Sequence, residues 1–210
     1  MNIKTSTQSH DHSLKNKGKR IFLKTKIGIW IDGKLYWLRH GTEKILLEES
    51  ITISIRQEAI HSDICLSNIF VTNHNGNERE VKIFVMHYHD DHSADQFTFI
   101  SPTEKVIYHL ANGSVFLVNG HMDGEFMKEY SIQPIWNVET DEFWNCKNKG
   151  TLFYQPMFRG LACSVFSINI ALPGLTTSQG NTWIITGESK SKLIQLNQVL
   201  AKKLTSSTAN

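Results

Sequence analysis

The chain has 210 residues, of which 22 are Lys or Arg and 20 are Asp or Glu, so its formal net charge is +2. This near balance gives no field strong enough to recruit nucleic acid or an anionic membrane surface, and we expect neither as a partner. No window approaches the roughly 18 apolar residues that span a bilayer. Residues 1–20 also lack the apolar stretch of a secretory signal. We therefore expect a cytoplasmic protein.

The first predicted elements form a hairpin. Residues 1–19 are polar and mixed in charge, and we expect them to be disordered. Strand-type residues then run over Lys26–Ile31 and Lys34–Leu38, joined by Asp32-Gly33. An Asp-Gly pair readily adopts the positive φ angles of a two-residue type I′ turn, which predicts a tight hairpin. Two further strands are predicted at Ile51–Gln57 and Asp63–Thr72.

Val81–Tyr88 is predicted to be a central strand. Val81, Ile83 and Val85 alternate with Lys82, Phe84 and Met86. Because a strand points alternate side chains to opposite faces, both faces of this strand are largely apolar. Such a strand is typical of the interior of a packed sandwich.

The end of this strand is rich in histidine, and two interpretations follow. His87 and His89 share one strand face and could capture a divalent metal ion, with Asp90, Asp91 or His92 completing the ligand set. The alternative, which we favour, is a strand end whose polar groups face water or cap a turn. We expect no cofactor beyond such an adventitious metal ion.

The second half of the chain predicts more strands and one helix. The expected strands are Gln96–Ile100, Lys105–Leu110, Ser114–Asn119, Leu161–Leu172 and Thr182–Thr186. Residues 121–160 lack a steady period of two, so we expect irregular segments and a short helix around Asp141–Lys147. A terminal helix is predicted because Leu193, Leu196, Val199 and Leu200 fall on one helical face. The predicted fold class is all-β, with a single domain at 20–204, one C-terminal helix and a disordered tail at 205–210.

Four segments, in this order, resemble the N-terminal β-supersandwich domain of bacterial glucoamylase-like enzymes of glycoside hydrolase family 15. They are IGIWIDGKLYWL (27–38), IFVTNHNGNEREVKIFVMHYHDD (69–91), VIYHLANGSVFLVNG (106–120) and NTWIITGESKSKLIQLNQVL (181–200). The resemblance covers Lys19 to Lys203 and implies a two-layer antiparallel β-supersandwich of the galactose mutarotase-like superfold. In that family the catalytic glutamates lie on a helical barrel after this domain, whereas this sequence ends at Asn210. We therefore assign no catalytic residue.

Candidate ligand-binding residues come from two patterns. Sugar binding needs flat aromatic faces beside planar polar groups, and Trp136 and Trp144 meet that composition, although the interpretation that we favour is that they cover the sandwich core. By fold-level analogy with the mutarotases, a histidine acid could work with a carboxylate base drawn from Asp91, Glu125 or Glu139. The ligand-binding candidates are thus Trp136, Trp144, His87, His89, Asp91 and His109, and the metal candidates are His87, His89 and His92.

These patterns support three hypotheses. The first is a non-catalytic, carbohydrate-associated domain that acts in sugar binding or in assembly with a partner. The second is a small sugar enzyme of the mutarotase type, and the third is a protein-interaction module without sugar affinity. A free-standing copy of an accessory domain would expose an apolar face. We therefore expect a homo-oligomer or a separate catalytic subunit as partner, beside an oligosaccharide or sugar ligand.

Overall fold

Strand β6 (Arg79–His89) lies at the centre of the first of two sheets. The computed structural model describes residues 23–90 and 95–207, so the tail predicted at 1–19 lies outside the described residues. Ile83 and Val85 of β6 pack in the core between the two sheets, whereas Phe84 and Met86 pack on the opposite face. All four side chains are buried. The prediction of an interior strand is confirmed.

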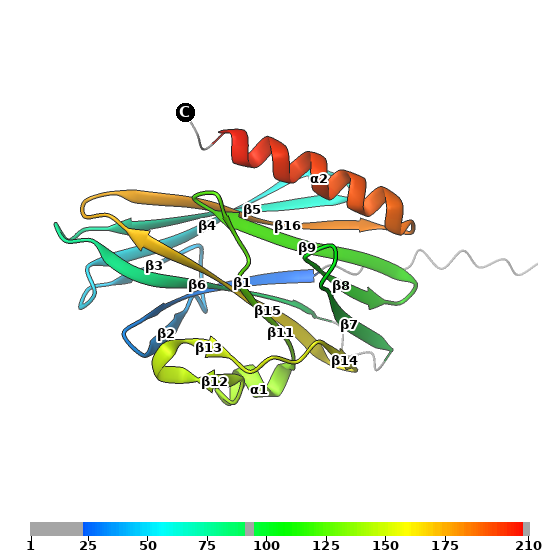
Figure 1. Ribbon diagram of the computed structural model, residues 1–210, viewed down its shortest axis with the longest axis horizontal. Coiled ribbons are helices and arrows are strands. Elements are labelled where there is room, and N and C mark those ends of the chain that lie inside the picture. Colours follow the sequence, from blue (N-terminus) through cyan, green and yellow to red (C-terminus); the bar gives the residue numbers. More distant parts are fainter. Residues whose placement is uncertain (1–22, 91–94, 208–210) are drawn as a thin grey trace, which may run out of the picture.

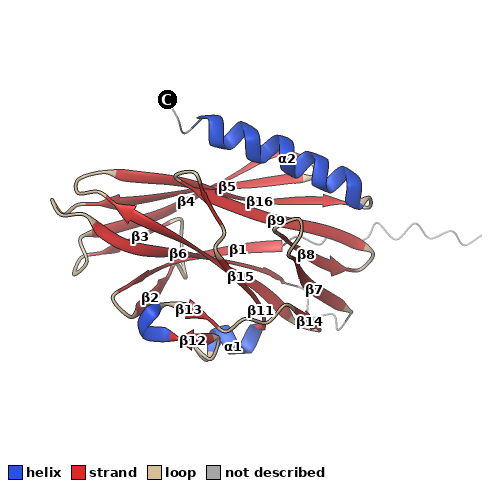
Figure 2. Ribbon diagram, in the orientation of Figure 1, coloured by secondary structure: helices blue, strands red, loops and turns tan. Residues whose placement is uncertain are grey.

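The two sheets face each other as layers (Figures 1 and 2). The first sheet has the order β11-β15-β6-β1-β2, and the longer second sheet has the order β14-β7-β8-β9-β16-β5-β4-β3, with β10 paired to β9. Each of these pairings is antiparallel. The predicted all-β, two-layer antiparallel sandwich is therefore confirmed.

The strands have the following bounds. In the first sheet they are β1 (Leu23–Ile31), β2 (Lys34–Trp37), β11 (Glu129–Pro134) and β15 (Ala162–Leu172), together with β6. In the second sheet they are β3 (Glu43–Leu46), β4 (Ile51–His61), β5 (Ile64–Asn73), β7 (Gln96–Ser101), β8 (Val106–Ala111), β9 (Ser114–Met122), β10 (Glu125–Phe126), β14 (Met157–Arg159) and β16 (Thr177–Gly187).

The hairpin of β1 and β2 forms as its turn residues predict. Ile31 pairs with Lys34 across the two-residue turn, where Asp32 has a φ of 47° and Gly33 a φ of 85°. Positive φ at both positions is the signature of the type I′ turn, whose twist matches that of the flanking strands. The register that this turn fixes also pairs Gly28 with Trp37.

Helix α2 (Lys190–Ser207) lies along the outer face of the second sheet (Figure 1). Leu193 and Leu200 are buried against Trp183 of β16, as predicted. Val199 is 62% exposed, so its predicted place on the buried face is wrong. The buried place is taken by Asn197, whose Oδ1 accepts hydrogen bonds from Trp183 Nε1 at 2.9 Å and Asn119 Nδ2 at 3.2 Å. The helix also continues through 205–207, where the sequence predicted the start of a disordered tail.

Residues 135–152 cover the outer face of the first sheet with short elements: α1 (Ile135–Glu139), β12 (Trp144–Cys146), a 3-10 turn (Lys147–Lys149) and β13 (Thr151–Leu152). The helix predicted around Asp141–Lys147 is wrong. The helical turn instead starts directly after Pro134, and 144–146 pair with β13 as a strand. Among the described helices, none combines the length and apolar character needed to cross a membrane.

Candidate functional site

His87 and His89 point into the space between the two sheets. Both lie at odd-numbered positions of β6, on the same strand face as Ile83 and Val85, and are 0% and 4% exposed. The favoured interpretation of a strand end facing water is therefore wrong for these two residues. Strand β6 runs on to His89, whose ring lies 5.2 Å from that of Phe116 on the facing sheet.

Hydroxyl groups hold the buried imidazoles and join the two sheets. His109 of β8 is hydrogen-bonded through Nδ1 to Thr98 Oγ1 at 3.1 Å and through Nε2 to Ser164 Oγ, on the facing sheet, at 2.8 Å. His87 Nε2 lies 3.3 Å from Thr182 Oγ1, again across the two layers. These contacts satisfy both ring nitrogens of His109 and Nε2 of His87, which would otherwise be costly to bury, whereas His87 Nδ1 has no hydrogen-bond partner among the described residues.

The protonation of these histidines opposes a role in proton transfer. Burial lowers the pKa of His87 to about 3. Burial, together with the neighbouring His89 and His87, lowers the pKa of His109 well below its usual range. A general acid must carry its proton near the working pH, and neutral, buried rings do not. Within the described ranges neither His87 nor His109 forms an ion pair with a carboxylate.

The other residues of the acid–base and metal hypotheses lie elsewhere. Glu125 is exposed on β10, and Glu139 is exposed on α1, outside the first sheet. Asp91 and His92 fall outside the described residues. Across 23–90 and 95–207, no three His, Cys, Asp or Glu side chains are grouped as a metal ion would require. Metal capture by His87, His89 and His92 therefore stays a prediction.

The two candidate tryptophans lie on the opposite side of the first sheet from these histidines. Trp144 packs edge-on against Phe84, with ring centroids 5.4 Å apart, and its Nε1 donates to Asp141 Oδ1 at 2.7 Å. It thus helps to cover the core. Trp136 is 48% exposed, with its ring edge-on to Phe158. The structure therefore brings His87, His89 and His109 together between the sheets, but it places Trp136 and Trp144 on the other side of the first sheet.

A pocket of about 380 Å³ lies on the outer face of the first sheet, beside α1. We call it the outer pocket, and it combines aromatic, charged and apolar side chains from β1, β2, β6, α1 and the residues after β2. Its lining residues are Lys26, Trp37, Arg39, His40, Met86, Tyr88, Ile135, Val138 and Glu139. Among these residues, only Glu139 was named from the sequence, as a possible carboxylate base.

A glycine sets the position of Trp37 in the outer pocket. Gly28 is the cross-strand partner of Trp37, and a Cβ added to Gly28 would lie 2.8 Å from Trp37 Cε3. That distance is shorter than real Cβ contacts, so the indole rests against the bare backbone of β1. Trp37 thereby presents a flat ring, supported from behind, as part of the pocket wall.

The charges of the outer pocket are not paired with one another. Lys26 Nζ lies 5.3 Å from the centre of a Trp37 ring, within cation–π range. Burial and the neighbouring Arg39 lower the pKa of Lys26, and Glu139 partly offsets this effect. Within the described residues, Lys26, Arg39 and Glu139 form no ion pair at 4.0 Å or less. Their polar atoms are therefore available to a ligand.

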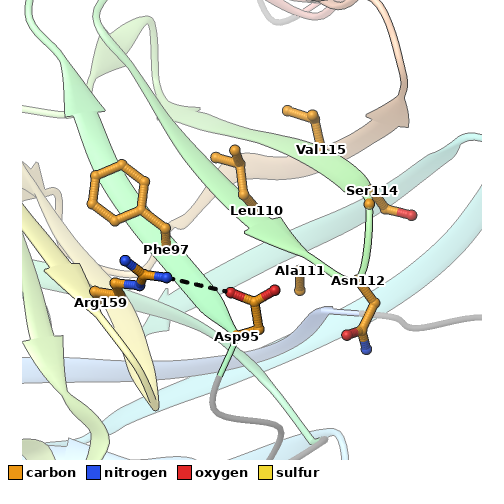
Figure 3. Close-up of a pocket in the computed structure, with 9 residues that line it drawn as sticks. Asp95, Phe97, Leu110, Ala111, Asn112, Ser114, Val115 and Arg159 are labelled. Carbon is orange, nitrogen blue, oxygen red and sulfur yellow. Dashed lines mark ion pairs between the residues drawn. The ribbon is translucent and has the colours of Figure 1, made fainter.

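A second hollow, of about 500 Å³, lies at the ends of β7, β8 and β9 (Figure 3). Its charged groups, Asp95 and Arg159, face each other at 3.8 Å, while its wall carries Phe97, Leu110 and Val115. The ring of Phe97 is stacked on Phe99, with centroids 5.4 Å apart. Its charges already have partners and its aromatic ring is already stacked, so this hollow suits a sugar less well than the outer pocket.

Comparisons with known proteins support the fold. No family model matches the chain, and no curated protein matches its sequence. The structure is similar to that of a bacterial glucoamylase complexed with acarbose, with a TM-score of 0.59 and 10% identity over 85% of this chain and 28% of that chain.

Two other solved structures match less closely. One is a polysaccharide lyase, with a TM-score of 0.45 and 11% identity over 80% of this chain and 27% of that chain. The other is a candidate kojibiose phosphorylase from the human microbiome, with a TM-score of 0.40 and 7% identity over 86% of this chain and 25% of that chain. The chain thus spans 28% of the length of the glucoamylase that it matches, and it has the fold found in that part, as the sequence resemblance predicted.

Proposed function

We propose that this protein is a non-catalytic, carbohydrate-associated domain that binds a sugar in the outer pocket. The observation that carries the proposal is Trp37, whose indole is held flat over Gly28 at the pocket wall. The apolar face of a pyranose stacks well on such a ring, because the ring is large, flat and amphipathic. The glucoamylase whose fold this chain shares is complexed with acarbose, which supports a carbohydrate-associated role.

The polar groups of the outer pocket suit sugar hydroxyls. Lys26 and Arg39 donate hydrogen bonds, and the Glu139 carboxylate accepts them, so both halves of a hydroxyl group can be satisfied. Met86 and Val138 supply an apolar floor, since both are buried. Convergent polar groups beside apolar side chains are typical of small-ligand sites.

Substitution of Trp37 tests this proposal. We expect Trp37→Ala to lower sugar affinity about two- to tenfold, since loss of an aromatic stacking contact of roughly 0.5–1.5 kcal/mol has that effect. Gly28→Ala should also weaken binding, because its methyl group displaces the indole without removing any group that contacts the sugar. A glycan array finds the sugar, and calorimetric titration then gives the affinities.

Trp136→Ala is the matched control, because Trp136 is an exposed tryptophan that does not line the outer pocket. It should leave the affinity unchanged. A loss of binding with Trp136→Ala but not with Trp37→Ala would move the site to the surface that the sequence indicated. Calorimetric titrations that show no heat of binding with any sugar would refute the proposed function.

Assembly with a partner is a second candidate function, favoured by four large apolar side chains within 136–158. Trp136, Phe153, Tyr154 and Met157 are each about half exposed. Exposed large apolar side chains often mark a protein–protein interface where they form a contiguous patch. We expect a homo-oligomer by light scattering after gel filtration, and Phe153→Asp should shift it towards the monomer. A wild-type mass of 24.0 kDa at high concentration would contradict self-association.

A further inference from the structure

We propose that the outer pocket selects a sugar that carries one carboxylate, as in a uronic-acid-containing oligosaccharide. This inference rests on the proposed function and adds the chemical class of the ligand. It comes from the balance and placement of charge among Lys26, Arg39 and Glu139.

Lys26 is the first part of the argument. Its side chain lies partly buried on the sheet face, next to the ring of Trp37, and has no carboxylate within ion-pair distance among the described residues. An ammonium group removed from water gains from an anionic partner. The next outward-facing lysine of the same strand, Lys24, has such a partner, because its Nζ lies 2.7 Å from Asp90 Oδ2. Lys26 therefore lacks, within the described structure, the partner that its neighbour has.

Arg39 is the second part. It follows β2 at the pocket rim, is exposed, and forms no ion pair in the described structure. A guanidinium group presents parallel N–H donors that match the two oxygens of a carboxylate. With Lys26 beside Trp37 and Arg39 at the rim, one carboxylate on a stacked sugar ring has two cationic donors available.

Glu139 limits the charge of the ligand. Lys26 and Arg39 contribute +2 and Glu139 contributes −1, so the pocket carries 2 − 1 = +1 when His40 is neutral. A single negative charge matches this balance. A phosphate monoester carries roughly −1.5 to −2 at neutral pH, and its excess charge would face Glu139. Glu139 remains able to accept hydrogen bonds from the sugar hydroxyls.

The test compares a trisaccharide that carries one galacturonate residue with its methyl ester, which keeps the sugar backbone but masks the carboxylate. We expect calorimetric titration to give about tenfold or more tighter binding of the acid, since hydrogen bonds to charged groups are the stronger ones. Arg39→Gln and Lys26→Met should each weaken binding of the acid more than binding of the ester, and so bring the ratio of the two affinities towards one. Lys24→Met, on the same strand face, should keep the preference.

The outcomes separate the two proposals. Equal, Trp37-dependent binding of the acid and the ester would overturn the carboxylate inference and leave the proposed function standing. No binding of either form, together with a blank glycan array, would overturn both. A preference for the acid that survives Arg39→Gln and Lys26→Met would show that other residues recognise the carboxylate. Tighter binding of a sulfated trisaccharide would overturn the assignment to carboxylates.

Discussion

Lowering the pH from about 7.5 to about 5 is expected to remove about 4 kcal/mol from the free energy of unfolding. In the folded protein the pKa of His87 is about 3 and that of His109 lies well below its usual range, both chiefly through burial. In the unfolded chain a histidine takes up its proton near pH 6.5. The stability from keeping these rings neutral is complete above pH 6.5 and declines as the pH falls towards the folded-state pKa. Each histidine contributes about 1.4 kcal/mol per pH unit in that window.

Urea denaturation at several pH values measures this effect. The free energy of unfolding should fall with a slope of about two protons or more between about pH 6 and about pH 5, since burial also lowers the pKa of His121. A loss of about 4 kcal/mol is large beside the roughly 5–15 kcal/mol that stabilises a typical domain. His109→Gln should reduce the slope by about one proton, even if that variant is less stable at every pH. His61→Gln, at the exposed end of β4, should keep the full slope. A flat profile down to pH 5 would contradict the account of the buried histidines.

Gly174→Ala is expected to lower the free energy of unfolding by about 2 kcal/mol or more. A Cβ at Gly174 would lie 2.1 Å from the carbonyl oxygen of Gly76, and no side-chain rotation relieves a clash with backbone. This contact joins the β5–β6 loop to the β15–β16 loop, where Leu175 N donates to Asn75 O at 2.9 Å. The clash would therefore separate two loops that close one end of the sandwich.

Gly76→Ala is the matched control on the other side of the same contact. Its added Cβ has no atom within 4 Å, and its φ lies outside the left-handed region, so stability should be unchanged or slightly raised. Chemical denaturation of the two variants in parallel measures the difference. Equal stabilities would mean that the two loops do not approach as described.

Local sequence signals predicted the central parts of the fold. The alternation of Ile83 and Val85 with Phe84 and Met86 predicted an interior strand, and Asp32-Gly33 predicted the hairpin, because turn chemistry and side-chain alternation act over a few residues. The same alternation includes His87 and His89, which continue the inward face. Their burial could therefore have been predicted from their odd-numbered positions on the strand. The hydroxyl partner of His87, Thr182, lies 95 positions further along the chain.

The candidate site was only partly predictable for the same reason. The hairpin register places Trp37 beside Gly28, so the supported indole follows from the turn alone. The position of Glu139 near Lys26 does not follow from the turn. It depends on how α1 packs against a sheet built from residues about 100 positions away. The sequence directed attention to Trp136 and Trp144 by composition. It contained no local signal that Trp144 packs on Phe84 or that Trp136 lies outside the outer pocket.

The most direct test of the central claim follows the indole N–H signals of the five tryptophans by NMR during titration with the sugar that the glycan array identifies. Sugar binding in the outer pocket predicts a saturable shift of the Trp37 signal, assigned with Trp37→Phe, while the buried Trp183 signal stays in place. A titration that saturates with the Trp37 signal unmoved would contradict the account.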